Sequence, residues 1–259
     1  MKVTAIIGGT GLEAGLDGFK VAEELTITTP YADSQVNIVR GYLAVDKSKQ
    51  DVFFLSRHGD NHHIAPNLIN YRANVFALKK LGVEQIIAVN AVGGLAKDML
   101  PKAIAIPCQI IDYSHSRAHT FFDGVFNELQ HTDFTYPYTQ GLRQILVDSA
   151  AIIDLPCVDG GVYACTQGPR LETAAEIKKL QRDGCDLVGM TGMPEAALAR
   201  ELDIEYASIC AVVNWGAGMT DTEINLEEIK QNLVVTMAGI QALLGVVLSS
   251  DNHLELDNQ

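Results

Sequence analysis

Short apolar runs, rich in β-branched residues, alternate along the chain with longer segments in which apolar residues recur every three or four positions. The short runs predict strands over residues 3–7, 51–56, 84–90, 103–112, 161–167, 186–190 and 205–214. Several of these runs are apolar at odd and even positions alike, which is typical of strands covered on both faces of a sheet. The pattern therefore predicts an α/β fold with a mixed, mostly parallel central sheet flanked by helices.

The longer segments predict helices. The first is expected over 66–82, because Pro66 suits an opening turn and Gly82 can close the helix. Its core-facing stripe is formed by Leu68, Tyr71, Val75 and Leu78. Further helices are expected over 139–153, 172–183, 194–203 and 224–248. Without a repeat, a low-complexity linker or a clear boundary, the chain is expected to form one domain over 1–259, with a core at about 3–248 and an acidic tail at 250–259.

The composition and charge limit the kinds of partner that the protein is expected to bind. The 259 residues are 47% hydrophobic and 20% charged, as in an ordinary globular protein with a sizeable core. A net charge of -13 disfavours binding to nucleic acid or to an anionic membrane. Five separated cysteines without a CxxC pair indicate core thiols of a reducing cytoplasm. The N-terminal apolar run is too short for a signal peptide and no apolar stretch reaches 18 residues, so we expect a cytoplasmic protein that does not span a membrane.

Ligands of such sheets bind at the carboxyl ends of the strands, so the residues that follow each predicted strand are the candidates for chemistry. In "IIGGTGL" (6–12) the glycines let the backbone approach an anion closely, and Thr10 adds a hydroxyl. The loop also fits the dinucleotide pattern G-x-G-x-x-G/A, but "GLDG" at 15–18 interrupts the helix that such a loop should enter. A tight turn is the remaining alternative.

Two more strand ends carry candidate residues. In "LSRHG" (55–59), Arg57 is a permanently charged fork and His58 a donor, a pair suited to gripping a tetrahedral oxyanion. A surface salt bridge explains Arg57 equally well at this point. In "NAVGGL" (90–95), the paired glycines could let the backbone line a ligand or could serve a tight turn.

Three later stretches complete the set. In "QGPRLETAAEI", Glu172 is either a helix-start charge or an acceptor for a ring N–H. In "VGMTGMPEAALARE", Met190 offers an apolar wall, Thr191 a phosphate-binding hydroxyl and Glu195 a helix-start charge; core packing of Met190 and helix capping by Thr191 are the alternatives. In "ICAVVNWGAG", Asn214 stands where an apolar strand opens into a glycine-rich loop, a place where a lone Asn usually serves turn chemistry.

Six motifs of this sequence, in the order in which they occur, resemble those of the trimeric purine nucleoside phosphorylase family, which includes methylthioadenosine phosphorylases. The motifs are "GGTGL", "SRHG", "NAVGGL", "GPRLET", "GMTGMPE" and "VVNWGAG". The resemblance covers about residues 3–248, and "SHSRAHTFFDG" (114–124) is similar to a loop of that family. It implies reversible phosphorolysis of a purine nucleoside in purine salvage, with inorganic phosphate as co-substrate and with no cofactor and no metal. It also implies a homotrimer, in which His131 is the candidate for reaching a neighbouring subunit's site.

The resemblance further implies individual roles. His58 and Asn214 are the expected catalytic residues. The phosphate site comprises Gly9, Thr10, Arg57, His58, Ala91 and Thr191. The nucleoside site comprises Asn90, Leu171, Glu172, Met190, Asn214, Trp215 and Gly216. Within it, Asn90 and Met190 are neighbours of the ribose, whereas Leu171, Glu172 and Asn214 contact the base; Trp215 either walls the base pocket or packs beneath the loop.

The base is expected to be a 6-oxopurine. Asn214, Trp215 and Gly216 stand where family members that take 6-aminopurines have an Asp-x-Asp motif. An amide at Asn214 can donate to N7 or O6, and the Glu172 carboxylate can accept from N1–H, which adenine lacks. A site built around a substrate N–H discriminates strongly against a base without one.

The 5′ end of the sugar is expected to carry a methylthio group. Where members that bind ordinary nucleosides have a histidine, this sequence has Leu226, or Ile224 in a neighbouring alignment. Either apolar residue suits a methylthio group and leaves a hydroxyl without a partner. The preferred hypothesis is phosphorolysis of S-methyl-5′-thioinosine to hypoxanthine and S-methyl-5-thioribose 1-phosphate.

Other functions remain open at this point. Within the same chemistry, they are a general inosine and guanosine phosphorylase and a methylthioadenosine phosphorylase. From other classes, they are a non-catalytic nucleoside-binding protein and a dinucleotide-binding oxidoreductase. His62 and His63 have no assigned role and lack a third residue spaced for a metal site.

Overall fold

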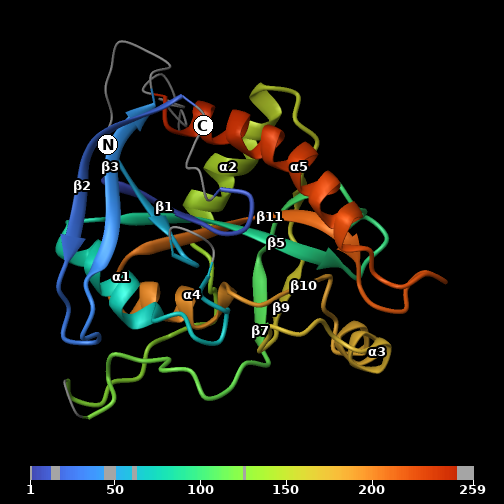
Figure 1. Cartoon of the computed structure of the whole chain (residues 1–259), viewed down its shortest axis with the longest axis horizontal. Helices are drawn as coiled ribbons and strands as arrows, with labels where there is room; N and C mark the ends of the chain where they lie inside the picture. The colour runs from blue at the N-terminus through green and yellow to red at the C-terminus, as the bar shows by residue number, and fades with distance from the viewer. Residues whose placement is uncertain (1, 13–17, 44–50, 60–62, 125–126, 250–259) are drawn as a thin grey trace, which may run out of the picture.

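The computed structural model describes residues 2–12, 18–43, 51–59, 63–124 and 127–249, which fold around one mixed sheet (Figure 1). The strands are β1 (Thr4–Gly8), β2 (Phe19–Ile27), β3 (Val36–Leu43), β4 (Val52–Ser56), β5 (Gln85–Gly94), β6 (Ile104–Ile106), β7 (Gln109–Asp112), β8 (Val158–Asp159), β9 (Val162–Cys165), β10 (Leu187–Gly189) and β11 (Glu205–Trp215). The helices are α1 (Tyr71–Lys80), α2 (Gln140–Ile152), α3 (Ala174–Arg182), α4 (Gly192–Glu201) and α5 (Leu226–Val247). The α/β fold class predicted from the sequence is confirmed.

The sheet follows the order β2-β3-β4-β1-β5-β10-β9-β7, with β11 pairing to β5 and leading on to β6 and β8. Strand β1 is parallel to β4 and β5, and β11 is parallel to β5. Strands β2, β3 and β4 are antiparallel neighbours, and β10 runs antiparallel to β5. Because β1, β4, β5 and β11 share one direction, the residues that follow them gather at one edge of the sheet.

The sheet divides at strand β5. On one side β5 pairs with β11 from Gln85 to Gly94. On the other side it pairs with β1 as far as Ala88 and with β10 from Gly93 onward. Within the described residues, residues 89–92 have no strand partner on that side, which leaves this stretch of the β5 edge open to side chains and to a ligand.

Helices cover both faces of the sheet, with α2 and α5 on one face and α1 and α4 on the other (Figure 1). Alternate residues of β11 enter the two cores, as the strand period of two requires. Those packed with the α1 and α4 side are Tyr206, Cys210 and Val212. Those packed with the α2 and α5 side are Ala207, Ile209, Ala211 and Val213. Coverage of both faces explains why the run 205–214 has no polar face in the sequence.

Two predicted elements need correction. The run 103–112 forms two strands, β6 and β7, because Pro107 lacks the N–H that a continuous strand would need. The first helix begins at Tyr71 instead of residue 66, with the Asn70 side chain accepting from the Ala73 N–H as the N-cap. Leu68 therefore precedes the helix and is 71% exposed, so its place in the predicted core stripe is wrong.

The antiparallel strands β2 and β3 were not predicted. Most of β2 is exposed, so its sequence, "FKVAEELTI", lacks the continuous apolar run that marks the buried strands. It lies at the end of the sheet order, where one side of the strand carries no neighbour within the described residues. The predicted tail at 250–259 lies outside the described residues, and the predicted limits of the core stay a prediction.

Of the described helices, only α5 is long and apolar enough to cross a membrane by length and composition. It packs against β11 and buries Met237, Ile240 and Leu244 in the core of that face. The five cysteines are unpaired thiols, and burial raises the pKa of Cys165 to about 12, so this thiol is protonated at neutral pH.

Candidate active site

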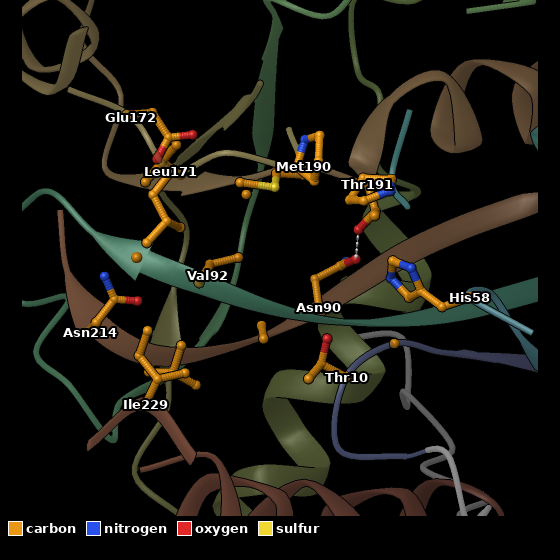
Figure 2. A pocket seen from close by; sticks show the side chains of 18 of the residues that line it. Thr10, His58, Asn90, Val92, Leu171, Glu172, Met190, Thr191, Asn214 and Ile229 are labelled. Atoms are coloured by element: carbon orange, nitrogen blue, oxygen red, sulfur yellow. Dashed lines mark hydrogen bonds between the residues drawn. The ribbon is translucent and has the colours of Figure 1, made fainter. Parts of the chain in front are cut away.

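A cavity of about 450 Å³ opens where the sheet divides, beside the ends of β1, β4, β10 and β11 and along the gap in β5 (Figure 2). It brings together most of the residues named from the sequence: Gly9, Thr10, Arg57, His58, Asn90, Ala91, Leu171, Glu172, Met190, Thr191, Asn214, Gly216 and Ile224. Thr10, His58 and Thr191 lie toward one end of the cavity, and Leu171, Glu172 and Asn214 lie toward the other (Figure 2). We call these the polar end and the amide end.

Arg57 and Glu195 form a buried ion pair beside the polar end. Nε and Nη2 of Arg57 donate to the two carboxylate oxygens over 2.7 and 2.9 Å, and Nη1 donates to the Val89 carbonyl over 3.1 Å. The Tyr206 hydroxyl donates to the same carboxylate over 2.8 Å. Burial alone would lower the pKa of Arg57, but Glu195 outweighs it and raises that pKa above its ordinary value. Arg57 is therefore a fixed cation, and the surface salt bridge considered from the sequence is wrong.

The prediction of Glu195 as a helix-start charge is confirmed, and the pairing with Arg57 gives this residue a second role. Glu195 stands in the first turn of α4, and its side chain is 1% exposed and is shared between Arg57 and Tyr206. Three of the five Arg57 N–H groups are used by Glu195 and Val89. Within the described residues, the other two N–H groups have no hydrogen-bond partner, so Glu195 sets the orientation of Arg57 without saturating it.

Gly9 lets the loop after β1 approach this ion pair. A Cβ atom at Gly9 would lie 2.8 Å from Nη1 of Arg57 and 2.9 Å from the Val89 carbonyl oxygen. Any other residue would displace one of them, so the glycine is required for close approach as well as for a turn. Gly11, with a φ of +95°, then turns the chain just after Thr10.

The other side chains of the polar end are held by hydrogen bonds. His58 Nδ1 lies 2.8 Å from the Ile64 carbonyl oxygen, and because a carbonyl only accepts, Nδ1 carries the proton in this contact. The Thr191 hydroxyl donates to Asn90 Oδ1 over 2.8 Å (Figure 2), and Asn90 Nδ2 donates to Ser208 over 2.7 Å. Thr191 makes no side-chain hydrogen bond to the first turn of α4, so the capping role considered from the sequence is wrong.

At the amide end, a β-bulge aims Asn214 at the cavity. The register of β11 against β5 shifts between Val212 and Asn214, and the carbonyl of the bulged Val213 accepts from the buried Asn232 side chain of α5 over 2.9 Å. Bulges next to active sites re-aim side chains in this way. Asn214 Nδ2 donates to the Trp215 carbonyl over 2.6 Å, which fixes the carboxamide; Oδ1 and the second N–H bond no other described residue and can meet a ligand.

Glu172 lies half-buried at the same end, one residue before the N-cap of α3. Its Oε1 accepts from the Thr166 hydroxyl over 2.6 Å. The helix-start charge is supplied instead by Glu176, which forms a capping box with Thr173. The helix-start interpretation of Glu172 is therefore wrong, and its carboxylate faces the cavity.

Apolar side chains line the cavity between and beside its two ends. Met190 is half-buried there and not in the core, and Val92 lies nearby on β5 (Figure 2). Ile224 and Ile229 also line the cavity, from the segment that leads into α5 and from its first turn. The cavity thus joins hydrogen-bonding groups at two ends through an apolar wall, a combination that holds a small molecule with polar groups at both ends.

Three residues named from the sequence do not line the cavity. Leu226 is 66% exposed at the start of α5. Trp215 is half-buried, and its contact with the amide end is the backbone carbonyl that holds Asn214. His131 is exposed in the segment between β7 and α2.

The sequence did not single out several residues that the fold brings to the site. Ile229, Val92 and residues 64–66 line the cavity, and so does His63, to which the sequence assigned no role. Thr166 bonds the Glu172 side chain, Tyr206 bonds Glu195, which orients Arg57, and Asn232 bonds the backbone carbonyl of Val213. Their only sequence signal is a polar atom inside an apolar segment, and this signal does not tell which partner the atom will meet. In the described part of the chain, no group of three or more His, Cys, Asp or Glu side chains is arranged to hold a metal ion.

This α/β fold and cavity define a protein that binds a small molecule, with a fixed arginine at one end of the site and a carboxylate beside an amide at the other. The chain belongs to the phosphorylase superfamily, whose family model matches residues 3–248. The resemblance found in the six sequence motifs is confirmed, and an enzyme is indicated over a non-catalytic binding protein or a dinucleotide-dependent oxidoreductase.

Individual relatives agree with this family. The chain is 49% identical to a protein of Pseudomonas syringae named "Probable S-methyl-5'-thioinosine phosphorylase", over 96% of this chain and 100% of the relative. It is 43% identical to the "6-oxopurine nucleoside phosphorylase" of Pyrococcus furiosus, over 88% of this chain and 85% of the relative. The solved structure of methylthioadenosine phosphorylase from Schistosoma mansoni with adenine superposes with a TM-score of 0.88 at 28% identity, over 96% of this chain and 91% of that one.

Proposed function

We propose that the protein catalyses the reversible phosphorolysis of a 6-oxopurine nucleoside, with S-methyl-5′-thioinosine as its preferred substrate. Phosphate and nucleoside give hypoxanthine and S-methyl-5-thioribose 1-phosphate. One observation carries the proposal. The Glu172 carboxylate and the fixed amide of Asn214 lie at the same end of a single cavity, and Arg57 lies at the other end. The names of the relatives from Pseudomonas syringae and Pyrococcus furiosus support the same reaction class.

Phosphate occupies the polar end in this proposal. Two N–H groups of Arg57, the side chains of Thr10, His58 and Thr191, and the backbone near Gly9 and Ala91 surround it. Because Nδ1 of His58 contacts the Ile64 carbonyl, Nε2 is the nitrogen that exchanges a proton or hydrogen bond with phosphate. Fixed donors that need no rearrangement supply both proximity and electrostatic stabilisation.

The reaction moves charge along the cavity. A phosphate oxygen forms a bond to C1′ of the sugar while the bond from C1′ to N9 of the purine breaks, and the electron pair of that bond goes to the purine. The sugar is positive at the transition state, so the phosphate is nucleophile and counter-charge at once. Asn90 and Met190 flank the sugar. The departing purine takes up one proton at N7, beside Asn214, and hydrogen phosphate releases one as it becomes the dianionic sugar phosphate, so the protons balance.

The base is selected at the amide end. The Glu172 carboxylate accepts from N1–H of a 6-oxopurine, the second N–H of Asn214 donates to O6, and Asn214 Oδ1 accepts from N7–H once N7 is protonated. Adenine presents a lone pair at N1, so it would face the carboxylate without a proton between them. Discrimination of about 10⁴ is attainable by this means. Leu171 and Gly216 border the base, whereas Trp215 acts through its backbone.

The 5′ substituent meets Ile224 and Ile229. These residues line the cavity, whereas Leu226, the other candidate from the sequence, is turned to solvent. An apolar wall favours a methylthio group over a hydroxyl, which would lose its hydrogen bonds to water. Ile224 is therefore our candidate for the specificity position.

We further propose a cytoplasmic homotrimer that uses inorganic phosphate as co-substrate and needs no cofactor. His131 would act on a neighbouring copy's cavity. Exposed Leu129 and Tyr136 flank it on the same segment and offer apolar surface for such a contact.

A nucleoside panel tests the proposal. Release of free base from S-methyl-5′-thioinosine, inosine, guanosine and S-methyl-5′-thioadenosine is measured with and without phosphate. We expect release only with phosphate and the highest kcat/KM for S-methyl-5′-thioinosine. Equal values for inosine would indicate a general 6-oxopurine phosphorylase, a preference for S-methyl-5′-thioadenosine would contradict the role of the amide end, and no phosphate-dependent release would contradict the reaction.

A further inference from the structure

We propose that Thr166 is a positioning residue that makes the enzyme select 6-oxopurines, because its hydroxyl holds the Glu172 carboxylate in the orientation that accepts the purine N1–H. The inference rests on the proposed function of Glu172. Neither the family motifs nor the predicted site residues include Thr166. It stands directly after β9, and its side chain approaches Glu172 from a second hollow, next to the active-site cavity and lined by both residues.

The hydrogen bond between these residues is short and directed. The Thr166 Oγ1 atom lies 2.6 Å from Glu172 Oε1 and 3.3 Å from the Gly189 carbonyl oxygen. A hydroxyl has one proton to donate. The Glu172 carboxylate is charged and lies closer than the Gly189 carbonyl, so the carboxylate is the stronger acceptor. Oε1 is therefore occupied, and Oε2 accepts no hydrogen bond from any part of the chain that the structure describes. Glu172 thus keeps one oriented acceptor for a ligand N–H.

Thr166 can hold Glu172 because its own backbone is held on both sides. Its N–H donates to the Gly189 carbonyl over 2.8 Å, and Gly189 directly precedes Met190 of the cavity. Its carbonyl accepts from Nη2 of Arg117 over 3.1 Å, and the same nitrogen donates to the Gln167 carbonyl over 2.8 Å. Arg117 is itself buried and also donates to the Met193 carbonyl. The donor is therefore pre-positioned before a base enters.

This orientation has an electronic consequence. A carboxylate that already accepts a hydrogen bond from Thr166 serves the base as an acceptor, which matches N1–H of hypoxanthine and opposes the N1 lone pair of adenine. Without the Thr166 proton, the carboxylate can turn about its last bond and N1–H loses a fixed partner. Selection between the two bases would then weaken although Glu172 itself remains.

The test compares Thr166→Val, which keeps the shape of the side chain and removes its proton donor, with Thr166→Ser, which keeps the donor. The measured quantity is the ratio of kcat/KM for S-methyl-5′-thioinosine to that for S-methyl-5′-thioadenosine. We expect the ratio to fall about tenfold or more in Thr166→Val, as for loss of a hydrogen bond to a charged group, and to stay within about threefold of wild type in Thr166→Ser. If Thr166→Val does not fold, Thr166→Ala takes its place.

The same change is then made in a Glu172→Ala background. A residue that acts through Glu172 has no further effect on the ratio there, whereas a merely structural residue would lower both activities in both backgrounds. The inference is overturned if Thr166→Val keeps the wild-type ratio while Glu172→Ala loses it; the proposed function then stands. If wild type releases no hypoxanthine, or if Glu172→Ala keeps the ratio, the proposed role of Glu172 fails, and the inference fails with it.

Discussion

The two ends of the cavity each contain a glutamate near the start of a helix, yet the two carboxylates are used in opposite ways. At the polar end, Glu195 is 1% exposed, and both of its oxygens are taken by Arg57, with Tyr206 as a third partner. At the amide end, Glu172 is half-buried and one of its oxygens bonds Thr166. Both oxygens of Glu195 are thus bonded within the protein, whereas Glu172 keeps one oxygen as an acceptor for a ligand.

The difference shows that, within one small site, one carboxylate holds the protein's own side chains in place and the other recognises the ligand. A buried carboxylate must be paired, so it can orient a cation but cannot select a ligand. A carboxylate at the cavity wall keeps contact with water until a ligand replaces it, so it can discriminate between ligands. The predictions below test this division, beginning with the change of largest expected effect.

Glu195→Ala should destabilise the protein far more than Glu172→Ala. It leaves the buried Arg57 charge and the Tyr206 hydroxyl without their carboxylate, which costs about 3–5 kcal/mol for a broken buried pair. Glu172→Ala removes a half-buried group and should change the free energy of unfolding by about 1 kcal/mol or less. Urea denaturation of the two variants measures the difference. Equal stabilities would contradict the division between the two ends.

A double variant serves as the control. Replacing the pair by apolar residues, Arg57→Met with Glu195→Leu, removes both charges together and should recover much of the stability lost in Glu195→Ala. Phosphorolysis should nevertheless be lost, because no guanidinium remains for phosphate. If the double variant is as unstable as Glu195→Ala, the uncompensated arginine is not the cause of the loss.

The second prediction concerns how the amide end is built. Asn232→Leu removes the donor to the carbonyl of the bulged Val213, which should cost about 1–3 kcal/mol for a buried acceptor left unpaired. Because the bulge aims Asn214, we also expect kcat/KM for the 6-oxopurine nucleoside to fall by about tenfold. Urea denaturation and steady-state kinetics measure the two effects.

Thr236→Val is the matched control for Asn232→Leu. Thr236 is equally buried on the same helix, but its hydroxyl bonds carbonyls within that helix and does not reach β11. Its substitution should leave kcat/KM for the 6-oxopurine nucleoside unchanged. If Asn232→Leu also leaves catalysis unchanged, the bulge is maintained by the strand pairing alone.

The comparison also explains how far the sequence could predict this molecule. The buried strands β1, β4, β5 and β11 were found because double-sided burial leaves an apolar run. Arg57 and Asn214 were noticed at the ends of two such runs and Glu172 in the stretch after the run 161–167, and the resemblance of the motifs gave them their roles. The exposed strand β2 left no such signal. The hydrogen-bond partner of each polar atom was not predictable. Arg57 bonds Glu195, which is 138 residues away in the sequence, and Asn232 bonds the carbonyl of Val213 at a bulge that no local pattern marks.

The smallest expected effect lies between the two ends, at the apolar wall. Ile224 lines the cavity, whereas Leu226, two residues later, is exposed, so the two positions form a matched pair. Ile224→Ala removes apolar contact and should weaken selection for the methylthio group over a hydroxyl by about 1–1.5 kcal/mol, roughly tenfold. Leu226→Ala should leave this selection unchanged. The ratio of kcat/KM for S-methyl-5′-thioinosine to that for inosine measures both. If selection is lost in Leu226→Ala but kept in Ile224→Ala, the residue that contacts the 5′ group is Leu226 of α5 and not Ile224. If selection is kept in both variants, the methylthio group is recognised elsewhere.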